Sequence, residues 1–166
     1  MAKKSVPKEV LLDGAQMAFS ALVAGTMGFL KKGNIPIKDW VSYIGEQFDG
    51  SLADLEGEEV DRVMEHLLTL EVLPMGAEVI SSEANAQKSE VKVTTLPSRA
   101  LLEKFGTTPK ELLKGFGVTE MEFASIYTMY EPAAKAIGLR FRHQLKEGQE
   151  ILSLEPMARS SSARKA

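Results

Sequence analysis

The chain has 166 residues, of which 44% are hydrophobic and 26% charged, and its formal net charge is −3. This length suits one domain with its own core, and the acidic balance argues against a nucleic-acid binder, which carries a basic surplus. The absence of cysteine excludes disulfides, thiolate metal sites and a cysteine nucleophile, and it fits a reducing compartment such as the cytoplasm.

The N-terminal third contains the longest apolar segment of the chain. A predicted helix begins near Pro7 and ends at Gly33, and its part from Gly14 to Leu30 carries no charge. This part is shorter than the about 20 predominantly apolar residues of a membrane span, and it contains polar side chains and glycines. We therefore expect a helix packed against protein rather than one in a membrane.

Small residues recur four apart within this helix, at Ala21 and Gly25 and again at Ala24 and Gly28. Such spacing lets a second helix approach closely. One interpretation is packing within the chain, which every helical domain needs. The other is a homodimer, or a contact with a partner protein, with these four residues at or near the interface.

The segment from Lys8 to Leu73 is predicted to be almost wholly helical apart from two turns. An acidic stretch from Glu46 to Glu65 contains Arg62 as its one basic residue. An EF-hand calcium loop needs glycine at its sixth position, and counting from Asp49 the glycine falls second. We therefore predict no metal site and interpret the acidic residues as the solvated start of a helix, where carboxylates complement the helix dipole.

Two further regions have the features of hairpins and short helices. The runs Ala77–Glu83 and Glu90–Thr95 are predicted to be paired strands around a polar loop. Ser98 is a candidate cap for a helix that reaches Phe105. Thr108 then begins a second short helix, with proline at the first position and an acid at the third.

The last third gives the clearest pattern. Thr119 and Glu122 have the spacing of a capping box, and apolar residues recur at helical steps from there to Ile137. Gly138 can end this helix. Leu139–Leu145 alternates between apolar and polar residues, as does a strand with one buried face, and Ile151–Glu155 can return beside it after a turn at Glu147 and Gly148.

Four strands in two hairpins, with helices before and between them, predict an α+β domain over residues 1–156. Its N-terminal helical half is expected to pack on a small antiparallel sheet. Residues 157–166 are small, polar and basic, and we predict a disordered tail. The order of elements over about Ala77 to Glu155 is similar to that of the hydrocarbon-binding, vinyl-reductase-type domains. That resemblance implies a pocket for a small apolar ligand, but the cysteine-rich closing hairpin of that family is absent here.

One group of side chains is the candidate site. Aromatic residues recur along one face of the last helix, and strand alternation places His143 on the same face as Phe141 and Leu145. Such a stripe forms core or lines a pocket for a planar or apolar ligand. The candidate ligand-binding residues are Phe123, Tyr127, Tyr130, Phe141 and His143. His143 is also the candidate acid or base, and its alternative is a hydrogen-bonded core or rim residue.

The sequence contains no phosphate-binding loop and no nucleophile elbow, so we predict no cofactor. Our interpretation is a non-catalytic module that binds a small apolar or planar ligand, or a partner protein, beside the helix–sheet interface. One alternative is a small cysteine-free enzyme that uses His143. The other is a structural subunit of an assembly.

Overall fold

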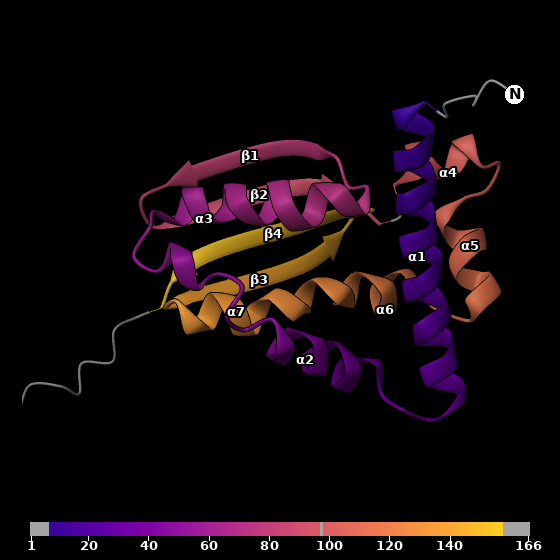
Figure 1. Ribbon diagram of the computed structural model, residues 1–166, viewed down its shortest axis with the longest axis horizontal. Helices are drawn as coiled ribbons and strands as arrows, with labels where there is room; N and C mark the ends of the chain where they lie inside the picture. The colour runs from indigo at the N-terminus through magenta and orange to yellow at the C-terminus, as the bar shows by residue number, and fades with distance from the viewer. Residues whose placement is uncertain (1–6, 97, 158–166) are drawn as a thin grey trace, which may run out of the picture.

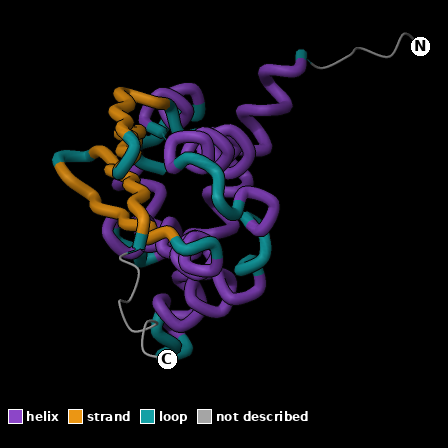
Figure 2. The backbone as a smooth tube through the Cα atoms, turned by 90° about the vertical axis from the view of Figure 1, so that its left-hand side faces the viewer, coloured by secondary structure: helices purple, strands orange, loops and turns teal. Residues whose placement is uncertain are grey.

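The computed structural model describes residues 7–96 and 98–157, and these residues form a sheet with helices on one of its faces (Figure 2). Its strands are β1 (Val79–Asn85), β2 (Lys88–Thr94), β3 (Leu139–Lys146) and β4 (Gln149–Pro156). All neighbours are antiparallel, and the order is β1-β2-β4-β3. The predicted α+β class with two hairpins is therefore confirmed. The predicted tail, apart from its first residue, lies outside the described residues.

The strands extend beyond their predicted ends toward short turns. Asn85, expected in a loop, ends β1, and its side-chain oxygen accepts a hydrogen bond from the Gln87 amide at 2.9 Å. At the second hairpin, Glu147 and Gly148 both have positive φ, at 54° and 73°. A two-residue turn of this kind matches the twist of the flanking strands, and glycine adopts its second position without strain.

The N-terminal half is helical, as predicted. It contains α1 (Lys8–Lys32), α2 (Ile37–Gln47), η1 (Ala53–Leu55), α3 (Val60–Leu67), η2 (Leu68–Val72) and η3 (Leu73–Met75). Between the hairpins lie α4 (Arg99–Lys104), α5 (Pro109–Phe116), α6 (Glu120–Ala124), η4 (Ser125–Tyr130) and α7 (Glu131–Ala136).

These helices form one layer over the sheet and a group at its end. Figure 1 shows α3 and the α6–α7 segment crossing the same face of the sheet, with α1 upright at one end and α4 and α5 beside it. The core lies between α3, the α6–α7 segment and the sheet. It includes the buried side chains of Met64, Leu67, Val91, Val93, Phe123, Tyr127, Phe141, Leu152 and Leu154.

Capping side chains fix where the short helices begin. Thr108 and Glu111 form a reciprocal capping box, and so do Thr119 and Glu122. In the second box the Glu122 amide donates to Thr119 Oγ1 at 3.2 Å, and the Thr119 amide donates to Glu122 Oε2 at 2.8 Å. Ser98 likewise accepts a hydrogen bond from the Leu101 amide. All three predicted helix starts are confirmed.

The segment after Thr119 is not one continuous α-helix, in contrast to the prediction. Residues Ser125–Tyr130 form a 3₁₀ stretch between α6 and α7. Pro132 explains its position, because proline has no amide to donate to the Thr128 carbonyl and its ring crowds that carbonyl. The Glu131 amide donates to the Thr128 carbonyl instead, which is the i to i+3 bond of a 3₁₀ helix.

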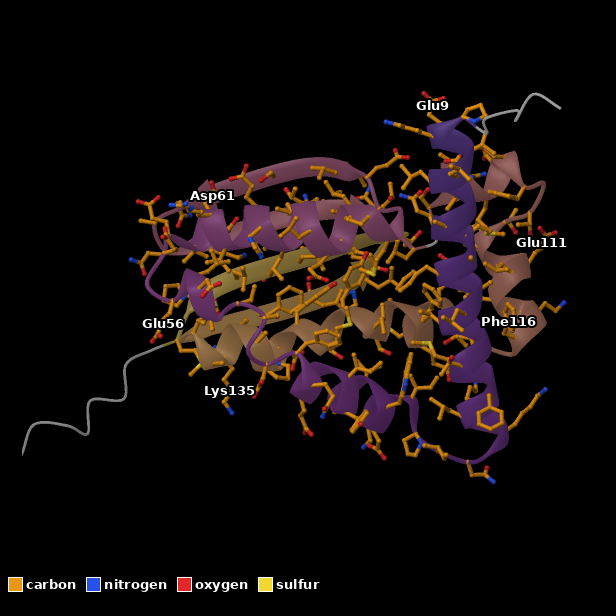
Figure 3. All side chains as sticks on the ribbon, in the orientation of Figure 1. Glu9, Glu56, Asp61, Glu111, Phe116 and Lys135 are labelled. Carbon is orange, nitrogen blue, oxygen red and sulfur yellow. The ribbon has the colours of Figure 1, made fainter. Side chains whose placement is uncertain are left out.

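Helix α1 packs against the later part of the chain along one face. A side chain at Gly28 would meet the Phe116 carbonyl oxygen at 2.4 Å, so the two backbones touch there. Figure 3 shows Phe116 beside α1. Ion pairs lie on either side of this contact, between Asp13 and Lys104 at 2.7 Å and between Lys31 and Glu122 at 2.9 Å. Packing within the chain thus explains why a glycine occupies position 28.

Helix α1 is also long and apolar enough to cross a membrane, a property that core helices share.

The contact at Gly28 generates a stability prediction. Gly28→Ala places a methyl group against a backbone oxygen that cannot move freely, and we expect a net loss of about 1–2 kcal/mol in the free energy of unfolding. Gly14→Ala is the matched control, because nothing lies within 4 Å of its added carbon. It should gain about 0.5–1 kcal/mol from helix propensity. Urea unfolding of both variants is the measurement, and equal stability of the two would contradict the close α1–α5 packing.

Candidate functional site

A histidine and a carboxylic acid meet on the inner face of the sheet. His143 Nε2 lies 2.5 Å from Glu150 Oε2, and the two side chains are 7% and 2% exposed. His143 is paired across the strands with Leu152, so Glu150 is its diagonal neighbour, within reach of a long side chain. With the carboxyl group ionised, the imidazole N–H donates to it. A polar pair this deeply buried is stable only because its members satisfy each other.

The helical layer covers this pair with aromatic rings. The rings of Tyr127 and His143 lie 5.3 Å apart at 35°, and those of Tyr130 and Phe141 lie 5.8 Å apart in an edge-to-face arrangement. Both tyrosines belong to η4, and both of their partners belong to β3. The structure therefore brings four of the five predicted site residues into two contacts across the helix–sheet interface.

The fifth, Phe123, is buried in the core on α6. Phe123, Tyr127 and Tyr130 are enclosed by protein, whereas Phe141 and His143 also border a hollow of about 500 Å³ that is lined mostly by residues of the outer face of the sheet. Their role in ligand binding stays a prediction.

Two buried hydroxyl groups next to the pair have no protein partner. Tyr127 Oη and Tyr130 Oη, together with Ser20 Oγ, are the buried side-chain polar atoms without a hydrogen bond among the described residues. Burial raises the pKa of the Tyr127 phenol well above its ordinary value, and nearby Glu150 and Tyr130 raise it further. Burial, followed by the charge of Glu71, also raises the pKa of Tyr130. Both phenols are therefore neutral at physiological pH.

Sequence reasoning missed Glu150. The second strand of the last hairpin was expected to begin at Ile151, which placed Glu150 in the turn. Strand β4 begins at Gln149, and Glu150 then shares the inward face with Leu152 and Leu154. The signal that was available is the two-residue period, because extending it backward from Leu152 reaches Glu150.

A groove runs from the α5–α6 connection to the edge of β3, next to His143. It consists of two adjoining pockets of about 670 and 410 Å³ that share Met121 and Leu145. We call this feature the β3 groove. Its lining side chains are Lys110, Leu113, Lys114, Val118, Thr119, Glu120, Met121, His143, Gln144, Leu145 and Lys146. Leu113 and Val118 are buried at its floor, whereas Met121 is 61% exposed.

The other charged groups of the molecule are less suited to form an anion-binding or metal-binding site. Arg140 and Arg142, which could clamp an anion, both contact Glu155, at 3.4 and 3.0 Å. A hollow of about 930 Å³ at the far end of the sheet is bordered by the acidic turn before α3 and by the first turn of α3 (Figure 3, Glu56 and Asp61). Within the described ranges, however, no cluster of three metal-binding side chains occurs.

No protein-family model matches the chain, and no curated protein matches it. The similarity to hydrocarbon-binding domains therefore stays a prediction from the order of elements.

The unpartnered Tyr127 hydroxyl gives a pH prediction. Below about pH 9 the phenol is neutral in both folded and unfolded chains. As the pH rises above about 10, the unfolded chain loses this proton and the folded chain keeps it, so stability falls. Tyr127→Phe should remove up to about 1.4 kcal/mol of that loss per pH unit. At pH 7 it should cost under about 1 kcal/mol, because no hydrogen bond to a protein group is lost.

Denaturant unfolding of the wild type and variant between pH 7 and 11 measures both effects. Tyr43→Phe, which removes an exposed phenol from α2, is the control. A loss well above 1 kcal/mol at pH 7 would contradict the absence of a partner for the hydroxyl.

Proposed function

We propose that the protein is a small-molecule-binding module whose site is the β3 groove, and that its ligand is an amphipathic anion with a planar or extended apolar body. The observation that carries the proposal is an apolar floor with lysines around it, directly beside the buried His143–Glu150 pair. Pockets for small ligands are of this size and combine apolar walls with a few polar groups.

The floor supports an apolar ligand. Leu113, Val118 and Leu145 line it, and Met121 projects from α6 with most of its surface free. An unbranched thioether adapts to ligands of different shape at little cost. Removing about 100 Å² of apolar ligand surface from water is worth roughly 2.5 kcal/mol, which is about a third of the roughly 8 kcal/mol of a micromolar affinity.

The lysines around the β3 groove favour a ligand with a negative charge. Lys110 and Lys114 come from α5 and Lys146 from the end of β3, and Glu120 is the one acid in the same lining. The net charge of the groove lining is therefore positive, although the net charge of the whole chain is negative. Ammonium groups on flexible stems recognise a carboxylate, sulfonate or phosphate as point charges.

The His143–Glu150 pair gives the enzyme alternative its specific support. A carboxylate that holds an imidazole by one nitrogen is the arrangement that orients a catalytic base. No nucleophile among the described residues stands in a recognised motif with it, so we favour binding. His143→Gln separates the two: a binding module whose affinity comes from the apolar floor and the lysines, with His143 in a structural role, keeps its ligand affinity nearly intact, whereas an enzyme loses turnover on the order of 10²–10⁴-fold.

Fluorescence titration with 11-(dansylamino)undecanoate, a planar ring on a fatty-acid chain, tests the binding proposal. We expect a micromolar dissociation constant, and the double variant Lys114→Ala/Lys146→Ala should weaken it about tenfold, since each exposed ion pair contributes up to about 1 kcal/mol. Met121→Asp should weaken it further by placing a carboxylate on the floor.

Two controls make this result specific. Lys135→Ala removes an exposed lysine from α7, outside the groove, and should leave the affinity unchanged (Figure 3). The uncharged dansyl-undecyl alcohol should bind the wild type and the double lysine variant equally. The proposal is wrong if the carboxylate probe does not bind, or if its affinity is indifferent to Met121→Asp and to the lysines.

A further inference from the structure

The outward face of α1 carries large apolar side chains that no described part of the chain covers. Leu22 is 69% exposed and Phe29 71% exposed, and Leu11 is also mostly exposed. This face is opposite the one that packs on the protein, because Asp13, Gly28 and Lys31 hold α1 to α4, α5 and α6. Figure 1 shows α1 upright between the sheet with its helical layer on one side and α4 and α5 on the other.

The spacing along this face is that of a helix–helix seam. The exposed residues Leu11, Ala15, Ala18, Leu22 and Phe29 follow one another at steps of four, three, four and seven. Apolar residues at alternating steps of four and three form the contact line of a coiled coil, whose partner is another helix. An amphipathic helix on a membrane surface shows the same alternation, so a membrane is the alternative occupant that the experiment has to separate from a second copy.

We propose that this face of α1 binds the same face of α1 in a second copy of the chain, with the two helices antiparallel. About a two-fold axis level with residue 20, Ala18 lies opposite Leu22 of the other copy and Leu11 lies opposite Phe29. The small residue of each central pair accommodates the large one. Antiparallel helices also bring opposite ends of their dipoles together.

The size of the contact sets its strength. At 1.5 Å per residue α1 is about 38 Å long, and a partner helix covers a strip about 10 Å wide. The strip is on the order of 400 Å², about half of the 800 Å² that each partner contributes to a standard interface. The dimer should therefore dissociate on dilution through the micromolar range.

Because the chain has no native cysteine, introduced thiols report the arrangement directly. Leu11→Cys and Phe29→Cys are made as separate full-length variants and oxidised alone and mixed. The mixture should form a disulfide-linked dimer. Leu11→Cys alone should not, since its two copies lie about 27 Å apart in the antiparallel pair. Leu70→Cys, equally exposed on η2, is the control for random collision.

Sedimentation equilibrium completes the test. Leu22→Glu should raise the dimer dissociation constant about 30-fold or more, as for a central interface residue, without changing the circular dichroism spectrum. A wild-type chain that is monomeric at high micromolar concentration would overturn the proposal. Efficient cross-linking of Leu11→Cys with itself would overturn the antiparallel arrangement. A monomer that instead co-sediments with phosphatidylcholine vesicles, and loses this with Leu22→Glu, would assign the face to a membrane.

Discussion

The hydrogen bond between His143 and Glu150 is the constraint on which the sheet and the helical layer both depend. An ionised carboxyl group in a protein interior costs several kcal/mol unless it is paired, and here its one side-chain partner stands on the neighbouring strand. The pair exists in one register of β3 against β4. A slip of β4 by one residue would turn Glu150 to the solvent side and leave His143 on the inner face without its partner. The Glu147–Gly148 turn, with both residues at positive φ, fixes that register locally.

The helical layer covers the buried His143–Glu150 pair with aromatic side chains. Tyr127 lies over the imidazole and raises the apolar character of its surroundings, while Tyr130 meets Phe141 one contact farther along β3. The 3₁₀ stretch of η4 places these rings, and Pro132 together with the Thr119 capping box determines where that stretch lies. The same capping box holds Lys31 through Glu122, so the position of α1 is linked to the segment that covers the site. The β3 groove, the buried pair and α1 are thus parts of one connected arrangement.

The sequence predicted those features that depend on neighbouring residues. The capping boxes at Thr108 and Thr119 and the turn at Gly148 need only residues within one turn of chain, and each was found where expected. The alternation in β3 likewise placed His143 on the inward face. The fold class followed from the order of these elements.

Features that depend on distant residues were not predictable. Nothing near Gly28 in the sequence indicates that the Phe116 carbonyl touches it. The β3 groove combines α5, α6 and β3, which tertiary packing alone brings together. The 3₁₀ stretch was missed although Pro132 was visible, because the apolar period continues through it.

A double-mutant cycle on the buried pair tests this account most directly. His143→Phe leaves the Glu150 carboxyl group buried without its partner and should cost about 3–5 kcal/mol in the free energy of unfolding. Glu150→Leu in the same chain should restore most of that loss, because the pair is then replaced by apolar residues of similar size. Urea unfolding of the wild type, the two single variants and the double variant gives the coupling energy. Losses that simply add would show that the two side chains do not depend on each other, and would contradict the account.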